Sequence, residues 1–140
     1  MGFDNIVVVD TTLREGEQFV SADFSTEDKL DLAHALCDFG IQFLELTSPA
    51  ASKRSRSDAE KIASANLPAM IAAHIRCHVD DAAIALDTGV GALNMVMAIS
   101  PILRAASHGR AIPEVVRIAA ETAEFVRKRA PNVQLRFSSE

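Results

Sequence analysis

The segment D-T-T-L-R-E-G-E-Q, Asp10 to Gln18, places Arg14 beside Glu15 directly after the apolar run I-V-V-V at positions 6–9. That run has the composition of a strand buried on both faces. A carboxylate at the end of such a strand can ligate a divalent cation, and a neighbouring guanidinium can stabilise a developing oxyanion. The alternative is a local ion pair that closes the strand, and the two residues alone do not decide between these interpretations.

Polar side chains also follow four later apolar segments. Two of these side chains, the imidazole of His74 and the guanidinium of Arg136, are suited to binding an anion. His74 could instead hydrogen-bond within the core, and Arg136 could be an inward-pointing charge that protects a strand edge. His34 is expected on a helix surface, and S-H-G-R at 107–110 is equally consistent with a polar loop. The polar residues at the four segment ends are Thr47 and Ser48, His74 and Arg76, Ser100, and Arg136 and Ser138.

Apolar runs alternate with helical patterns along the whole chain. Strands are predicted at 6–9, 41–47, 70–75, 92–98 and 133–138. The first helix begins with a capping box at 25–28 and ends at Gly40, and S-D-A-E at 57–60 is expected to cap the second. The third spans 79–87, and the fourth carries the apolar stripe Val116, Ala119, Ala120, Ala123 and Val126.

Strands that alternate with helices predict a parallel sheet with right-handed crossovers. No Gly-x-Gly-x-x-Gly turn follows the first strand, so a dinucleotide-binding sheet is not supported. Polar residues at the carboxyl ends of several strands are instead typical of a (β/α)8 barrel. The predicted fold class is therefore α/β, a partial TIM barrel of about five parallel strands and four helices. A complete barrel takes about 250 residues, so residues 1–140 are interpreted as the N-terminal part of one catalytic domain.

Bulk properties narrow the function classes. The chain has 14 basic and 19 acidic residues and a net charge of −5, which argues against binding nucleic acid or an anionic membrane surface. Two cysteines without paired spacing fit a reducing compartment. No apolar stretch approaches the roughly 18 residues of a membrane span, and no export signal is evident at the start. A cytoplasmic location is therefore expected, without membrane association.

Five motifs, taken in order, resemble the homocitrate synthases, which belong to the metal-dependent acyl-CoA condensing and cleaving enzymes and share a (β/α)8 barrel. The later motifs favour homocitrate synthase over isopropylmalate synthase, whereas the first specifies only the superfamily. The resemblance covers essentially the whole chain. The motifs are D-T-T-L-R-E-G-E-Q, L-T-S-P-A-A-S at 46–52, H-I-R-C-H at 74–78, S-H-G-R at 107–110 and R-F-S-S-E at 136–140.

The resemblance implies an acyltransferase that condenses acetyl-CoA with 2-oxoglutarate to homocitrate, the first step of aminoadipate-type lysine biosynthesis. It implies a divalent metal ion, Zn, Mg, Mn or Co, with acetyl-CoA as co-substrate. Glu15 would be a metal ligand, and Arg14 would be catalytic by stabilising enolate and alkoxide charge. Substrate would be bound by Arg14, Gln18, His74, Arg136 and Ser138, the last three at the distal carboxylate. An ionised dicarboxylate does require cationic and hydroxyl donors.

Three departures from the family pattern stand out. The family's H-x-H metal ligands lie beyond Glu140, so metal binding by this chain alone is expected to be weak or absent. Asn94 occupies a position where the family usually carries Asp, and an amide cannot act as a base or pair with an ammonium group, as lysine feedback would require. V-G-A-L at 90–93 replaces the commoner V-D-G-V.

Two other functions remain open at the level of sequence. One is condensation with a different 2-oxo acid, such as one that bears a phosphonate, and the other is a non-catalytic split-barrel module that docks a partner chain. In every case the first and fifth strands would expose unpaired apolar edges. The remainder of the barrel, a second chain or homo-oligomerisation is expected to cover them.

Overall fold

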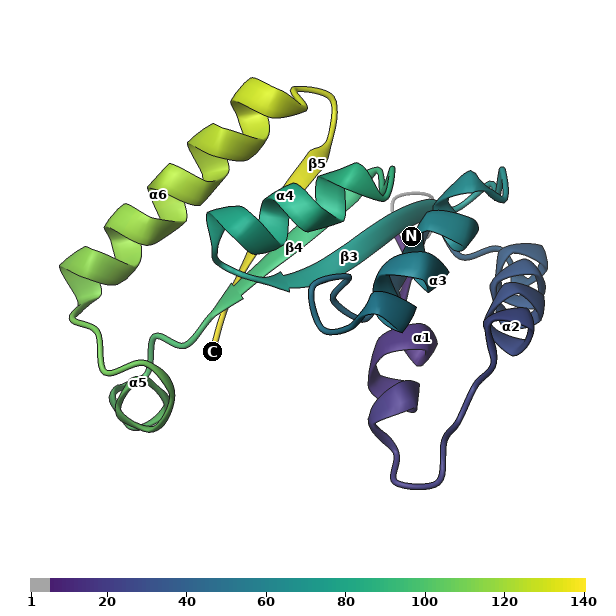
Figure 1. The fold of residues 1–140 in the computed structure, drawn as a ribbon, viewed down its shortest axis with the longest axis horizontal. Coiled ribbons are helices and arrows are strands. Elements are labelled where there is room, and N and C mark those ends of the chain that lie inside the picture. The colour runs from purple at the N-terminus through teal and green to yellow at the C-terminus, as the bar shows by residue number, and fades with distance from the viewer. Residues whose placement is uncertain (1–5) are drawn as a thin grey trace.

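A computed structural model describes residues 6–140. Its five strands form one sheet in chain order, each parallel to the next, which confirms the predicted α/β half-barrel (Figure 1). The strands are β1 (Val9–Asp10), β2 (Phe43–Leu46), β3 (Met70–Arg76), β4 (Ala92–Met97) and β5 (Gln134–Ser139). The helices are α1 (Thr12–Glu15), the 3-10 helix η1 (Gly16–Gln18), α2 (Thr26–Phe39), α3 (Lys53–Ser64), α4 (Val79–Asp87), α5 (Pro101–Ser107) and α6 (Ile112–Arg129).

Two of the α-helices were not predicted. α1 forms at the D-T-T-L-R-E-G-E-Q segment, and α5 lies between β4 and α6. Both are short, so neither carries the repeated apolar stripe by which a helix is recognised in sequence. Ser100 begins α5, because its hydroxyl accepts a hydrogen bond from the backbone N–H of Leu103 at 3.1 Å. This residue, one of the polar strand-end candidates, therefore has a capping role.

Of the two predicted helix starts, the one at 25–28 is confirmed and the one at 57–60 is wrong. Ser25 and Asp28 form the predicted capping box of α2, and Gly40 ends that helix with a φ of 101°. The prediction that 57–60 caps the next helix is wrong, because the N-cap of α3 is Ser52, five residues before Ser57. Asp58, the acid of that S-D-A-E segment, is instead buried and bonded to the ammonium group of Lys29 at 2.6 Å. The carboxylate of Asp58 therefore serves a tertiary contact with α2 and does not cap a helix.

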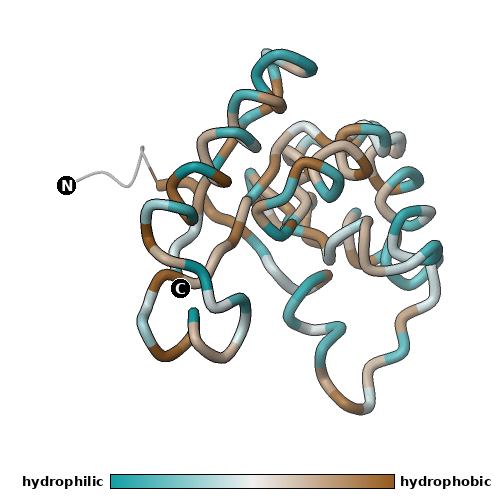
Figure 2. The backbone as a smooth tube through the Cα atoms, turned by 60° about the vertical axis from the view of Figure 1, so that its left-hand side comes forward, coloured by the Kyte–Doolittle hydropathy of each residue, from teal (hydrophilic) through white to brown (hydrophobic). Residues whose placement is uncertain are grey.

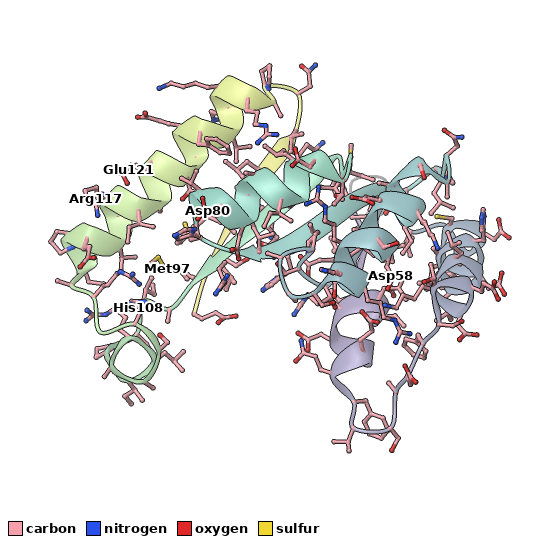
Figure 3. All side chains as sticks on the ribbon, in the orientation of Figure 1. Asp58, Asp80, Met97, His108, Arg117 and Glu121 are labelled. Carbon is pink, nitrogen blue, oxygen red and sulfur yellow. The ribbon has the colours of Figure 1, made fainter. Side chains whose placement is uncertain are left out.

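The hydrophobic core lies between the sheet and the helices that cover one of its faces, where α4 and α6 are in contact (Figure 1). The predicted stripe of α6 is partly wrong, since Val116 and Ala120 are exposed. Burial centres instead on Val115, Thr122 and Val126. Figure 3 shows Arg117 and Glu121 on the outer side of this helix, where they form an ion pair at 2.6 Å.

The sheet has an open edge at each end within the described residues, as predicted. The apolar run 6–9 next to the N-terminal trace is exposed, so the prediction that it is buried on both faces is wrong for these residues (Figure 2). Phe137 on β5 is exposed at the opposite edge. Among residues 6–140, no helix is both long enough and apolar enough to cross a membrane.

Candidate functional site

The sheet face opposite the helices, which we call the concave face, lines a cavity of about 320 Å3 and carries a buried carboxylate on β2. Glu45 on β2 is 3% exposed. Its Oε2 accepts a hydrogen bond from Arg14 Nε at 2.6 Å, and its Oε1 accepts one from Asn94 Nδ2 at 2.8 Å. Residues from α1, β2 and β4 are thereby connected through a single side chain.

The ionisation state of Glu45 follows from these contacts. Burial alone would raise the pKa of this carboxyl, but the side chains of His74, Asn94 and Arg14 outweigh burial and bring the pKa to about 2. Glu45 is therefore a fixed negative charge near neutral pH. As an ionised carboxylate, it can only accept hydrogen bonds.

Asn94 extends the network to β3 and β5. Its Nδ2 lies 3.3 Å from Nδ1 of His74, and its Oδ1 accepts a hydrogen bond from Ser138 Oγ at 2.8 Å. The imidazole Nδ1 lies 3.7 Å from Glu45 Oε2. Asn94 is thus buried with all its polar atoms engaged, and it joins two residues that were predicted to bind substrate.

The structure connects three of the six predicted site residues in this network: Arg14, His74 and Ser138. Arg136 is aligned with Asn94 across the sheet, and the two line a cavity of about 320 Å3 together with Glu45. The Arg136 side chain is exposed, and within residues 6–140 it has no hydrogen-bond partner. Gln18, at the end of η1, is exposed and likewise makes no side-chain hydrogen bond in the described part of the chain.

Glu15, the predicted metal ligand, is more than half exposed and accepts a contact from Arg14 Nη1. Across positions 6–140, no group of three or more His, Cys, Asp or Glu side chains is arranged to hold a metal ion. One accessible carboxylate fits the role of a single ligand and does not make a complete site. The described residues therefore do not fit a metal centre by themselves.

A buried ionic cluster supports the segment that carries Arg14 and Glu15. Lys29 on α2 contacts Glu17 of η1 and Asp58 of α3, and Thr47 donates a hydrogen bond to Glu17 at 3.0 Å. Figure 3 shows Asp58 on the side of α3 that faces α2. Burial would lower the pKa of Lys29, but its two carboxylate partners raise it. Burial would likewise raise the pKa of Asp58, but its hydrogen bond with Lys29 lowers it.

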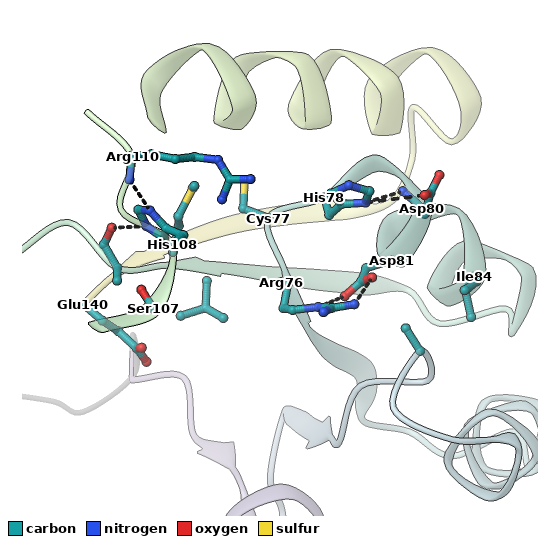
Figure 4. Close-up of a pocket in the computed structure, with 14 residues that line it drawn as sticks. Arg76, Cys77, His78, Asp80, Asp81, Ile84, Ser107, His108, Arg110 and Glu140 are labelled. Carbon is teal, nitrogen blue, oxygen red and sulfur yellow. Dashed lines mark hydrogen bonds and ion pairs between the residues drawn. The ribbon is translucent and has the colours of Figure 1, made fainter. Parts of the chain in front are cut away.

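A second, larger cavity of about 660 Å3 lies at the ends of β3 and β4 (Figure 4). Arg76 donates two hydrogen bonds, both of 2.8 Å, to the buried carboxylate of Asp81. The His78 ring caps α4, and His108 bonds the carbonyl of Ala98 and the N–H of Arg110, both at 3.1 Å. These side chains already have structural partners, and the concave face remains the better candidate site.

Sequence reasoning missed Glu45, the residue that organises the concave face. Its signal was a charged residue in the middle of the apolar strand I-Q-F-L-E-L-T. Successive strand residues point to opposite faces, so Phe43 and Glu45 share one face while Leu44 and Leu46 share the other. An acid at such a position requires a partner on a neighbouring strand.

Consecutive parallel strands, with polar side chains converging on the concave face, define half of a (β/α)8 barrel. The chain belongs to the HMGL-like family, which matches residues 5–140. The fold resembles that of a crystal structure of HMG-CoA lyase from Bacillus subtilis, with a TM-score of 0.76 at 21% sequence identity over 99% of this chain and 48% of that one.

Two fungal proteins are similar at the sequence level. The chain is 47% identical to the cytosolic isozyme of homocitrate synthase from Saccharomyces cerevisiae, over 98% of this chain and 32% of that protein. It is 50% identical to mitochondrial homocitrate synthase from Yarrowia lipolytica, over 95% of this chain and 29% of that protein. The chain thus spans about a third of the length of these relatives.

Proposed function

We propose that this chain is part of an acyltransferase that condenses acetyl-CoA with 2-oxoglutarate to give homocitrate and free CoA. The observation that carries the proposal is the concave face, where Arg14, His74 and Ser138 are joined through Glu45 and Asn94, with Arg136 beside them. The similarity to fungal homocitrate synthases supports the same reaction.

The charges on this face suit a dianionic substrate. Arg14 is balanced by Glu45 and Glu15, whereas the Arg136 guanidinium is exposed and aligned with Asn94. A planar guanidinium can bind a carboxylate through two parallel hydrogen bonds. Arg136 therefore holds the distal carboxylate of 2-oxoglutarate, assisted by His74. Ser138 already donates its proton to Asn94, so it must exchange that bond to donate to the substrate.

At the reacting end, Arg14 stabilises negative charge on the oxygen of the enolate and then of the alkoxide. Its orientation is fixed by the 2.6 Å contact with Glu45. Gln18 lies beside the oxo acid, and Glu15 supplies one ligand to a divalent cation, Zn, Mg, Mn or Co. Such a cation would polarise the keto carbonyl when bound. A carbon–carbon bond forms between the acetyl methyl carbon, which loses a proton, and the keto carbon, and water then cleaves the thioester.

The remaining parts of the proposal concern the whole protein. Further sequence or a second chain completes the barrel and covers the two open sheet edges, and the protein forms a homo-oligomer. It acts in lysine biosynthesis in the cytoplasm. The similarity to a cytosolic isozyme supports that location, although other relatives of the chain are mitochondrial.

A thiol-release assay tests the reaction. The protein is expressed from its complete coding sequence and supplied with acetyl-CoA, a divalent cation and a panel of 2-oxo acids, including a phosphonate-bearing one. The expected result is CoA release with 2-oxoglutarate as the preferred acceptor. Preference for another acid contradicts the assigned substrate, and absence of turnover with every acid favours a non-catalytic module.

A further inference from the structure

The network on the concave face determines which way the Asn94 amide points. Glu45 Oε2 accepts the 2.6 Å hydrogen bond from Arg14, and Oε1 of the same carboxylate lies 2.8 Å from one terminal atom of the Asn94 amide. If that atom were Oδ1, two acceptors would face each other at hydrogen-bond distance. It must therefore be Nδ2, and Oδ1 then receives the hydroxyl proton of Ser138.

This orientation has a consequence for His74. An amide nitrogen carries two hydrogens, and one of those on Nδ2 is donated to Glu45. The second is available to Nδ1 of His74, 3.3 Å away. A proton on Nδ1 would oppose that N–H, and the alternative acceptor, Glu45 Oε2, is 3.7 Å away and beyond hydrogen-bond distance. Nδ1 is therefore an acceptor.

We propose that Asn94 is a positioning residue that keeps Nδ1 of His74 a hydrogen-bond acceptor, so that a ring proton lies on Nε2. In the part of the chain that the structure describes, Nε2 has no hydrogen-bond partner. Its N–H is available to the distal carboxylate of the oxo acid. That substrate role rests on the proposed function, whereas the tautomer itself follows from the network alone.

An aspartate at this position would have the opposite effect. The oxygen that replaces Nδ2 would face both Glu45 and His74 and would attract a proton to Nδ1 of His74, while the other oxygen would keep the bond from Ser138. The other charged groups on this face are Arg14 of α1, which is bonded to Glu45, and Arg136 of β5. The Asn94 amide nitrogen therefore donates to both the Glu45 carboxylate and the His74 ring without adding a second negative charge.

The test is 15N NMR of the protein, produced from its complete coding sequence with 15N-labelled histidine, at neutral pH. The expected result is that His74 Nδ1 resonates as an unprotonated nitrogen and Nε2 as a protonated one. In Asn94→Asp, Nδ1 should shift to the protonated position. His108 is the internal control, because its bonds to Ala98 and Arg110 lie outside the network and its signals should not move.

Glu45→Gln provides a second variant should Asn94→Asp not fold. The new amide can donate to Asn94 Oδ1, which lets the Asn94 side chain turn over and present an acceptor to His74, so the Nδ1–H tautomer is expected. A protonated Nδ1 in the unaltered protein overturns the proposal. So does a His74 spectrum that is unchanged in both variants.

Kinetics separate this inference from the proposed reaction. If the protein condenses 2-oxoglutarate, Asn94→Asp should raise KM for the oxo acid about tenfold, the effect of losing one hydrogen bond to a charged group, while KM for acetyl-CoA stays constant. An unaltered protein that shows the expected tautomer and no turnover refutes the reaction and leaves the positioning role standing. An oxo-acid KM that is unchanged while the tautomer has shifted refutes the substrate contact.

Discussion

Glu45 illustrates at the residue scale how several side chains of a candidate site can depend on one buried group. It neutralises Arg14, orients Asn94 and remains ionised although almost fully buried. Its hydrogen-bond partners lie on α1 and β4, which are distant in sequence. That is why the motifs yielded candidate substrate-binding residues, whereas the partners of this buried acid could not be read from the sequence.

The low pKa of Glu45 predicts a pH dependence of stability. Burial raises the pKa, but hydrogen bonds to the ionised form lower it to about 2, from 4.5. The folded-state pKa is depressed, so the stabilisation is present above pH 4.5 and is lost as pH falls through the interval toward 2. The difference corresponds to about 3 kcal/mol. Urea unfolding from pH 6 to about pH 3 should show a shallower acid loss in Glu45→Gln than in the unaltered protein; parallel curves would contradict the assignment.

Substitution of Arg136 should show whether the substrate carboxylate is held by two parallel hydrogen bonds or only by a positive charge. Arg136→Lys keeps the charge and removes the planar fork, so KM for 2-oxoglutarate is expected to rise about tenfold or more. The matched control is Arg117→Lys on the exposed side of α6, where only an ion pair with Glu121 is altered and KM should not change. An equal effect of both substitutions would exclude Arg136 from the binding site.

Lys29 shows at the scale of elements how α2 and α3 support the segment that carries Arg14 and Glu15. Its ammonium group is buried between Asp58 and Glu17, so Lys29→Met leaves two carboxylates without their cation. The free energy of unfolding should fall by about 3–5 kcal/mol in denaturant titrations. Lys29→Met combined with Asp58→Leu should recover part of that loss, because an apolar pair avoids the unpaired charge. If the double variant is as unstable as the single one, the charge is not the cause.

Some element boundaries could be read from local chemistry and others could not. The capping box at 25–28 and the left-handed Gly40 involve residues close in sequence, so both predictions were confirmed. In contrast, Asp58 resembled a capping acid but serves a tertiary contact. The stripe of α6 was misplaced because alanine and valine occur on several sides of that helix, and only packing against α4 distinguishes them.

The two open edges of the sheet govern the behaviour of the whole molecule. Residues 6–9 and Phe137 expose apolar side chains where β1 and β5 lack outer neighbours in the described structure. Unpaired strand edges promote association between chains. Residues 1–140 expressed alone should therefore self-associate in a concentration-dependent way in size-exclusion chromatography with light scattering. Val8→Lys, which places a charge on the β1 edge, should shift the population toward monomer; a monomer at all concentrations would contradict this expectation.

Strand order along the sheet matches strand order along the chain, so each new strand pairs with the one made just before it. A nascent polypeptide leaving the ribosome could then add each strand–helix unit to a template that already exists. Because each strand pairs with the next one in sequence, the paired residues are separated by short stretches of chain, which favours rapid folding. The exception is the Arg14–Glu45–Asn94–Ser138 network, which spans α1 to β5. It is completed only when β5 is made, so the concave face acquires these polar contacts after β1 to β4 have paired.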